Sequence, residues 1–252
     1  MSRAVAASII VPGDDDAIQP FSSPYYGDSM SFEKSKALSL DDSMLSLLPD
    51  RRAHRSMSRA GIFLSYACLQ LQSALLPFLD ASPFSVGIYC AIENGPVDLK
   101  STVEMLDISG DGYAEQYRKS RNPKLFLMQL PNLAAAQMGI FLGIMGPMNV
   151  FNSSVYGSIH ALQQAENDLA DGRIKAALVC SAFSFENPLV LERIRRQNLG
   201  DRVLCEAAAA LLLTEDNPIS EWNDLHYDMT DSYYGISHQL VVQIKSQGGN
   251  QC

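Results

Sequence analysis

The chain has little positive charge, and this shortage excludes several kinds of partner. It carries 19 Lys and Arg against 28 Asp and Glu, which gives a net charge of −9 over 252 residues. Proteins that bind nucleic acid need a basic face for the phosphates, and anionic membrane surfaces attract basic segments. We therefore expect neither nucleic acid nor a membrane among the partners.

Cysteine pairs with the spacing of a metal site are also missing. The five cysteines are Cys68, Cys90, Cys180, Cys205 and Cys252, and no two of them form a CxxC pair. They stand far apart and mostly in apolar runs. We therefore expect buried free thiols in a reducing cytoplasm, with no metal and no redox cofactor.

Long apolar runs and a signal-peptide pattern are absent as well. A membrane-spanning helix needs about 20 consecutive apolar residues, and no run approaches that length. Hydrophobic residues nevertheless make up 47% of the chain and charged residues 19%, which is enough for a sizeable core. We expect a globular cytoplasmic protein.

The spacing of apolar residues predicts alternating helices and strands. The clearest helix is 57–79, where apolar residues recur every three or four positions. The basic residues at its start, among them Arg59, are expected to be solvated. A strand, a helix and a second strand follow between 148 and 181, which favours a parallel sheet. The other expected strands are 4–11, 85–93, 203–214 and, weakly, 239–244; the other helices are 39–48, 99–106 and 131–145; 13–36 and 109–123 are expected to be loops.

The region around Val155 has the sequence of a sharp strand-to-helix turn. An apolar strand, 148–154, ends there and an amphipathic helix, 155–170, begins. Free N–H groups and the dipole at a helix N-terminus stabilise nearby negative charge, so such turns often hold a nucleophile. Val155 has no nucleophilic atom and no proton to give, so we expect no catalysis by this residue.

Three motifs accompany this turn and carry a family resemblance. They are Pro131-Asn132-Leu133-Ala134-Ala135-Ala136 followed by Gly146-Pro147, then Ser153-Ser154-Val155-Tyr156-Gly157, and Asp201-Arg202-Val203-Leu204-Cys205-Glu206-Ala207. They resemble the Pro-Asn-Met-Ala-Ala-Gly helix with its Gly-Pro break, the Thr-Ala-Cys-Ser-Ser strand end and the Asp-Gly-Phe-Val-x-Gly-Glu-Gly-Ala segment of the β-ketoacyl synthases. Laid on this pattern, Val155 takes the position of the acyl-accepting cysteine.

The resemblance covers about 52–216 and implies an α/β, thiolase-like fold. We expect the N-terminal half of that fold only, a mixed sheet flanked by helices. Residues 1–216 would form a ketosynthase N-terminal-like domain. Residues 217–252 would be a C-terminal extension, either an added strand or a tail.

The resemblance also implies which catalytic groups are missing. The family's two histidines come from the second half of its fold, and His160, His226 and His238 do not stand in the family's His-Gly-Thr context. Ser153 or Ser154 could act as another nucleophile only with a nearby base, and no histidine is placed to serve as one. We expect that the chain is not an enzyme on its own, with a hydrolase that uses these serines as the weaker alternative.

A ketosynthase-like subunit without its cysteine resembles the chain length factor of type II polyketide systems. The resemblance implies a heterodimer with a cysteine-bearing ketosynthase, and an acyl carrier protein bound mainly through that partner. For the acyl-tunnel residues listed next, the alternative is ordinary core packing. The residues lining or closing the partner's acyl tunnel would be Leu125, Met128, Gln129, Leu130 and Leu133, and the dimer-interface strand would be Met148, Asn149, Val150, Phe151, Asn152, Ser153 and Ser154.

The favoured function is a non-catalytic subunit of a heterodimeric β-ketoacyl-carrier-protein synthase, acting in polyene, polyketide or fatty-acid-like chain elongation. The short chain resembles the ketosynthase-like partner of aryl polyene systems. The alternative is a stand-alone homodimeric pseudoenzyme that binds acyl chains or acyl carrier protein. Half of a duplicated fold should expose a large apolar face, so we expect poor solubility without a partner.

Overall fold

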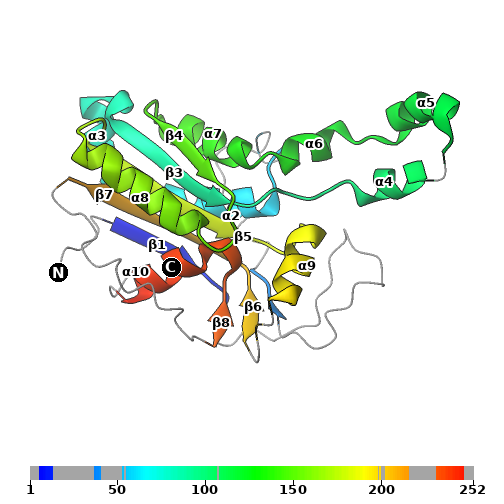
Figure 1. The fold of residues 1–252 in the computed structure, drawn as a ribbon. Coiled ribbons are helices and arrows are strands. Elements are labelled where there is room, and N and C mark those ends of the chain that lie inside the picture. The colour runs from blue at the N-terminus through cyan, green and yellow to red at the C-terminus, as the bar shows by residue number, and fades with distance from the viewer. Residues whose placement is uncertain are drawn as a thin grey trace.

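A five-stranded mixed sheet forms the centre of the computed structural model, which describes residues 6–13, 37–40, 53, 55–106, 108–197, 199, 202–215 and 231–246. β3, β4 and β5 are parallel to one another, whereas β7 runs antiparallel to both β5 and β1. The predicted mixed sheet is therefore confirmed. In order across the sheet, the strands are β1 (Ala6–Ile10), β7 (Ala207–Thr214), β5 (Ala176–Phe183), β3 (Val86–Ile92) and β4 (Met148–Phe151) (Figure 1).

Helices cover both faces of this sheet. α2 (Arg59–Leu69) and α7 (Pro131–Leu142) pack on one face, and α8 (Gly157–Ala170) and α10 (His238–Ser246) pack on the other (Figure 1). Successive side chains along a strand point to opposite faces. In β3, for example, the even-numbered side chains pack with α2 and α7, whereas Tyr89 packs with α8. The helix–sheet–helix layering expected from the sequence is confirmed.

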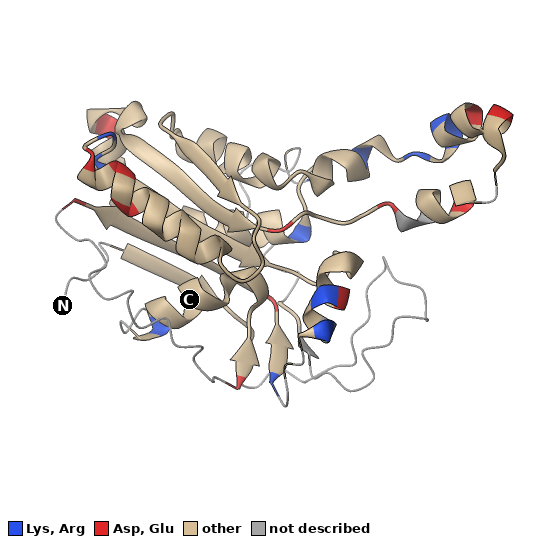
Figure 2. Cartoon of the chain, in the orientation of Figure 1, with Lys and Arg blue, Asp and Glu red and all other residues tan. Residues whose placement is uncertain are grey.

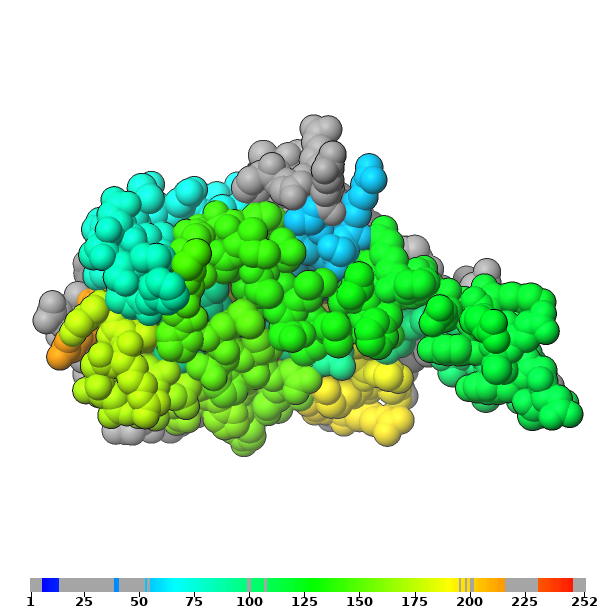
Figure 3. All heavy atoms as spheres, turned by 90° about the horizontal axis from the view of Figure 1, so that it is seen from above, coloured from blue at the N-terminus to red at the C-terminus, as the bar shows by residue number. Residues whose placement is uncertain are grey.

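Three short helices between β3 and α7 form an excursion in which the chain leaves the body of the molecule and then returns to it. They are α4 (Leu99–Leu106), α5 (Gly110–Ser120) and α6 (Pro123–Gln129). Seen from above, they project well beyond the rest of the molecule (Figure 3). We call residues 97–130 the arm. The loop expected at 109–123 is wrong, because α5 is helical: Asp111 lies in its first turn, Arg118 and Lys119 in its last, where each suits the helix dipole.

The single helix expected at 57–79 is also wrong. α2 ends at Leu69 and α3 (Gln72–Ala81) continues at an angle of 74° to it. The N–H of Leu71 donates to the carbonyl of Cys68 at 3.0 Å, a three-residue bond that tightens and ends α2. Leu71 and Leu75 are both buried, so the apolar spacing continues across the break and hides it.

Two other expected boundaries differ because of single residues. α7 stops at Leu142 rather than at 145, since Gly143 adopts a left-handed conformation (φ 73°) that ends the helix. The expected strand 203–214 is interrupted at Glu206, whose side chain turns into the interior. The first part, β6 (Val203–Cys205), joins β2 (Ala37–Leu38) and β8 (Ser232–Tyr233) in a small parallel sheet.

The last described segment, 231–246, packs against the main core. The strand expected at 239–244 is wrong, because this stretch belongs to α10, whose side chains Leu240, Val241 and Ile244 are buried beside α8. The expected division at residue 216 stays a prediction, since 216–230 lie outside the described residues. Most of the helix expected at 39–48 and of the loop expected at 13–36 also lies outside the described residues.

Across the described part of the chain, no single helix is long and apolar enough to cross a membrane. Two bent pairs, α2 with α3 and α6 with α7, pass that test only when their two helices are taken together.

Candidate functional site at the turn between β4 and α8

The turn after β4 has the strand-to-helix geometry that the sequence predicts. β4 ends at Phe151, the turn covers 154–156, and α8 begins at Gly157. The N–H of Gly157 donates to the carbonyl of Ser153 at 2.7 Å, which draws the chain sharply into the helix. Val155 stands in this turn and is half-buried. The structure thus keeps a helix N-terminus beside a residue that cannot act as a nucleophile.

The segment around 236 closes one side of this turn. The Ser158 hydroxyl donates to the carbonyl of Ile236 at 2.5 Å. A Cβ on Gly157 would lie 2.9 Å from the end of the Ile236 side chain, which would have to shift to make room for it. His160 is exposed and stacks on Tyr156, with 6.1 Å between the ring centroids. Among the described residues, no group of three or more His, Cys, Asp or Glu side chains is placed to hold a metal ion.

One edge of β4 is open. β4 pairs with β3 on one side and is the last strand of its sheet. Four large apolar side chains near this edge are exposed: Phe84 (66%), Ile140 (70%), Met145 (63%) and Met148 (43%). We call these four residues the edge patch. A hollow of about 570 Å³ lies between α7 and β4, and Figure 2 shows no charged residue on either element.

The predicted interface strand lies only partly in β4. Met148, Asn149, Val150 and Phe151 form the strand, whereas Asn152, Ser153 and Ser154 lie beyond its end. The Gly146-Pro147 break before the strand has a steric cause. A Cβ at Gly146 would lie 2.1 Å from the carbonyl oxygen of Val86, so only glycine fits.

The five predicted acyl-tunnel residues lie on one continuous segment where the arm returns to the body. Leu125, Met128 and Gln129 belong to α6, Leu130 precedes α7, and Leu133 lies in its first turn. All are half-buried except Leu130, which is 38% exposed. Their contact with an acyl chain stays a prediction.

Gln129 also lines a larger hollow inside the arm. This hollow has a volume of about 1160 Å³ and lies between α4, α5 and α6. Its apolar lining includes Met105 and Phe126, and the rings of Tyr113 and Tyr117 stack in parallel beside it. Polar residues such as Asp98 and Arg121 also line it, but most of its lining surface is apolar, so the hollow adds to the uncovered apolar surface of the arm.

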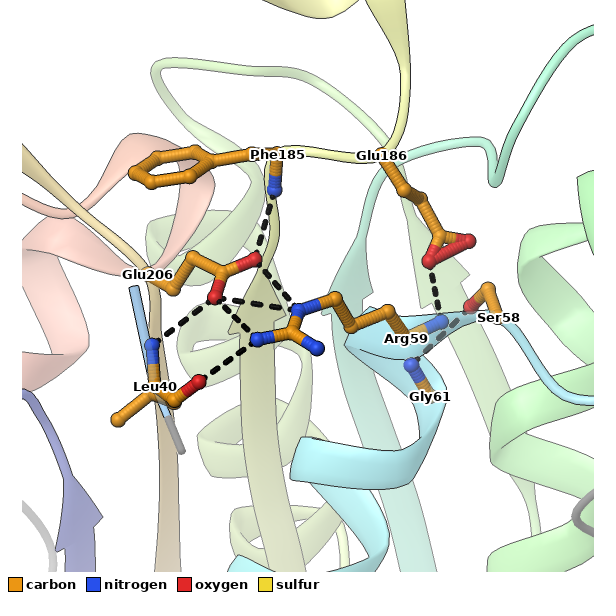
Figure 4. Close-up of polar contacts among 7 residues, drawn as sticks. All are labelled: Leu40, Ser58, Arg59, Gly61, Phe185, Glu186 and Glu206. Atoms are coloured by element: carbon orange, nitrogen blue, oxygen red, sulfur yellow. Dashed lines mark hydrogen bonds and ion pairs between the residues drawn. The ribbon is translucent and has the colours of Figure 1, made fainter. Parts of the chain in front are cut away.

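A buried ion-pair cluster, which the sequence did not reveal, lies at the start of α2 (Figure 4). Glu206 is almost fully buried, and its carboxylate accepts N–H groups of Arg59 (2.9 Å), Leu40 (3.0 Å) and Phe185 (3.0 Å). Arg59 in turn donates to the Leu40 carbonyl at 2.7 Å. The expectation that Arg59 is solvated is therefore wrong. The one available signal was that Glu206 matches the glutamate of a family motif.

Glu186 completes this cluster and holds the start of α2. Its carboxylate accepts the backbone N–H of Arg59, while the Ser58 hydroxyl caps the helix through the N–H of Gly61 at 3.0 Å. The pKa of Glu186 is raised to about 7, chiefly by burial; the N–H and charge of Arg59 oppose the rise, and the nearby Glu206 carboxylate adds to it. The cluster thus joins α2 to the loop after β5, to Leu40 and to the residue before β7.

Comparisons with known proteins agree with this fold. Three similar solved structures are ketosynthases: a type II polyketide synthase acyl-carrier protein in complex with its ketosynthase bound to the hexaketide (AntDE:AntF), the ishigamide ketosynthase/chain length factor, and the ketosynthase from module 6 of the bacillaene synthase from Bacillus subtilis 168. Their TM-scores are 0.58, 0.53 and 0.53, their identities 20%, 19% and 15%. The matches cover 70%, 71% and 84% of this chain.

The same matches cover 52%, 49% and 38% of those structures, so the chain spans about half of their length or less. At these identities the likeness shows the fold, which is the N-terminal domain of the thiolase-like ketosynthase fold. No curated protein sequence matched the chain. The family model of the β-ketoacyl synthase N-terminal domain matches residues 23–217, and the chain belongs to this family.

Proposed function

We propose that the chain is the non-catalytic, chain-length-factor-like subunit of a heterodimeric β-ketoacyl-carrier-protein synthase. The observation that carries the proposal is that Val155 lies in the turn between β4 and α8, the position that the motif resemblance matches to the family's cysteine. Acyl transfer to a side chain requires a nucleophile such as a thiolate, and the valine side chain is a hydrocarbon. The family scaffold is kept while its reactive atom is absent.

The proposed partner is a cysteine-bearing ketosynthase that covers the open edge of β4. An uncovered strand edge with apolar side chains beside it favours association with another chain. Stable interfaces bury more than about 1,000 Å², so the edge patch alone would not be enough and the arm would have to contribute. One of the similar structures, the ishigamide ketosynthase/chain length factor, supports a partner of this type.

The proposed role is to shape the acyl tunnel of that partner. Gln129 and Leu130 lie where the arm meets α7, next to the exposed apolar side chains of α6. Side chains placed in a confined apolar channel set by their bulk how far an acyl chain can extend. The chain would act on carrier-bound polyketide, polyene or fatty-acid-like chains, and the narrower proposal is the partner subunit of an aryl polyene system. Acyl carrier protein would bind mainly through the active subunit.

Co-expression with a cysteine-bearing ketosynthase tests this proposal. The expected result is a stable one-to-one complex that condenses acyl and malonyl groups on the carrier protein. Met148→Lys should reduce complex formation, because it places a charge within the proposed interface strand, whereas Asn167→Lys on the exposed side of α8 should not. A well-behaved homodimer that never pairs with a ketosynthase would instead support a stand-alone pseudoenzyme.

A further inference from the structure

The arm leaves the body and returns to it at two points that touch each other. It leaves near Gly95 and returns at Gln129, and the N–H of Gly95 points to the Gln129 carbonyl at 3.4 Å. A Cβ on Gly95 would lie 2.0 Å from the carbonyl oxygen of Met128, so the two backbones are in direct contact. We call this contact the arm root.

Asn187 binds the arm root from the loop after β5. Its side-chain amide donates to the carbonyls of Asn94 (2.9 Å) and Gly95 (3.0 Å), which uses both of its N–H bonds. Its side-chain oxygen accepts the N–H of Leu189 at 3.0 Å and so caps α9 (Pro188–Arg196). Asn187 is buried, and water cannot reach its polar atoms. Loss of any of these bonds would therefore leave a buried polar group without a partner.

A second asparagine connects the arm root to the loop after β4. The amide of Asn152 donates to the side-chain oxygen of Asn94 at 2.9 Å. Because β3, β4 and β5 are parallel, the loops that follow them meet at one edge of the sheet. Asn94, Asn152 and Asn187 belong to these three loops and bond them to one another.

The direction of the arm depends on its root. The main contacts of α4 are with α5, and those of α6 are with α7, so the outer part of the arm has little support from the body. A small change of angle at the root would move everything attached to it. Gln129, whose carbonyl is part of the root, and Leu130 beside it are the first residues affected.

We infer that Asn187 is the positioning residue of the arm, and that it sets product length by fixing Gln129 and Leu130 relative to the β4–α8 turn. The part of the inference that concerns product length rests on the proposed function. Asn187 would act through the arm root and not by contact with the acyl chain. Gly95 supports it, since any side chain there would force the two backbones apart.

Asn187→Ser and Asn187→Asp separate the root contacts from the helix cap. Serine and aspartate both cap helices well, so α9 keeps its N-cap. Serine removes the amide that binds the root, and aspartate places a negatively charged oxygen against the carbonyls of Asn94 and Gly95. Asn122→Ser is the matched control: Asn122 also precedes a proline and caps a helix, α6, through the N–H of Lys124 at 3.1 Å, but it does not belong to the arm root.

The first measurement is amide hydrogen exchange, on the heterodimer or, if none forms, on the chain alone. Both Asn187 variants should speed exchange in the peptides 94–98 and 126–131 by roughly 10-fold or more, as expected for the loss of one or two hydrogen bonds. Asn122→Ser should leave these peptides as in the wild type. Equal exchange in all four proteins would overturn the inference.

The second measurement is the product-length distribution of intact heterodimers, at matched complex concentration. Asn187→Ser should broaden the distribution, whereas Asn122→Ser should not, and a purely structural defect would lower the yield without changing lengths. Faster exchange with wild-type lengths would overturn the role in product length. If the wild-type chain pairs with no ketosynthase, the proposed function fails, and the exchange result alone decides whether Asn187 fixes the arm.

Discussion

Replacing Glu206 by Gln should destabilise the protein strongly, although the two side chains have nearly the same shape. The carboxylate accepts the N–H groups of Leu40 and Phe185 and two nitrogens of Arg59. An amide offers one acceptor oxygen and turns its own N–H bonds toward some of these donors. At least one buried donor then loses its partner, which costs about 1–3 kcal/mol.

Because Arg59 is charged, the whole change is that of a broken ion pair, and the lost hydrogen bonds are part of that cost rather than an addition to it. Removing one partner of a buried ion pair costs about 3–5 kcal/mol. Because 25% of the Arg59 side chain stays exposed to water, the lower end of that range applies, and we expect a total of about 3 kcal/mol. At ~2–4 °C per kcal/mol for a chain of this size, the Tm should fall by roughly 6–12 °C.

Denaturant and thermal unfolding at fixed protein concentration measure this effect. Glu215→Gln is the control, since Glu215 pairs with Lys175 at 3.7 Å and both side chains are 63% exposed. The loss of such a surface pair should cost less than about 1 kcal/mol. If Glu206→Gln costs no more than Glu215→Gln, the cluster is not a stabilising contact and the reasoning from Figure 4 is wrong.

Three other predictions concern catalysis, product length and pH. The isolated chain should have no condensing activity, and Val155→Cys should not restore it, because a new cysteine supplies neither of the two histidines that the family's reaction also needs; turnover by either purified protein would refute this. In intact heterodimers Leu130→Trp should shorten the products and Leu130→Ala should lengthen them. Overpacking the tunnel costs ~1–3 kcal/mol, which changes the partitioning between chain extension and release ~10- to 100-fold. Unchanged product lengths would mean that Leu130 has an ordinary packing role and does not line the tunnel. The pKa of Glu186 is about 7 in the folded state, above its ordinary value near 4.5, so the folded state holds the proton more tightly. Its stabilising effect is therefore present at low pH and is lost as the pH rises from about 4.5 through about 7, a change of ~3 kcal/mol at 1.36 kcal/mol per unit. Unfolding free energies of the wild type and Glu186→Gln across this range test it, and parallel curves would contradict it.

The central part of the fold could be predicted because the spacing of apolar residues in its sequence matches the positions that its helices and strands bury. The strands β3 and β5 and the helix α8 are each bounded by glycine, proline or polar residues, and their apolar positions match the faces they bury. α5 was missed because none of its residues is buried, so it has no apolar stripe to detect. The break between α2 and α3 was missed for the opposite reason, since the apolar spacing runs on through Leu71.

The contacts of the candidate site could be predicted less well, because they join residues far apart in the chain. The turn at Val155 is local, and a strand, a glycine and a helix pattern define it within about ten residues. Glu206 binds Leu40 and Arg59 across 166 and 147 positions, and Asn187 binds Asn94 across 93. A single buried carboxylate or amide within an apolar or polar stretch gives no sign of the partner that satisfies it.

The distribution of exposed apolar residues bears on how many partners the chain needs. The outward residues of α8 include His160, Gln163 and Asn167, which are polar and exposed, so this face is compatible with water. The large exposed apolar side chains lie mostly elsewhere, on the edge patch and on the arm, where Phe126 is 63% and Leu106 is 76% exposed. Both regions are visible in the view from above (Figure 3). A single partner that lies along β4 and reaches the arm would therefore cover most of this surface, and the poor solubility expected for the isolated chain should come from that side of the molecule rather than from α8.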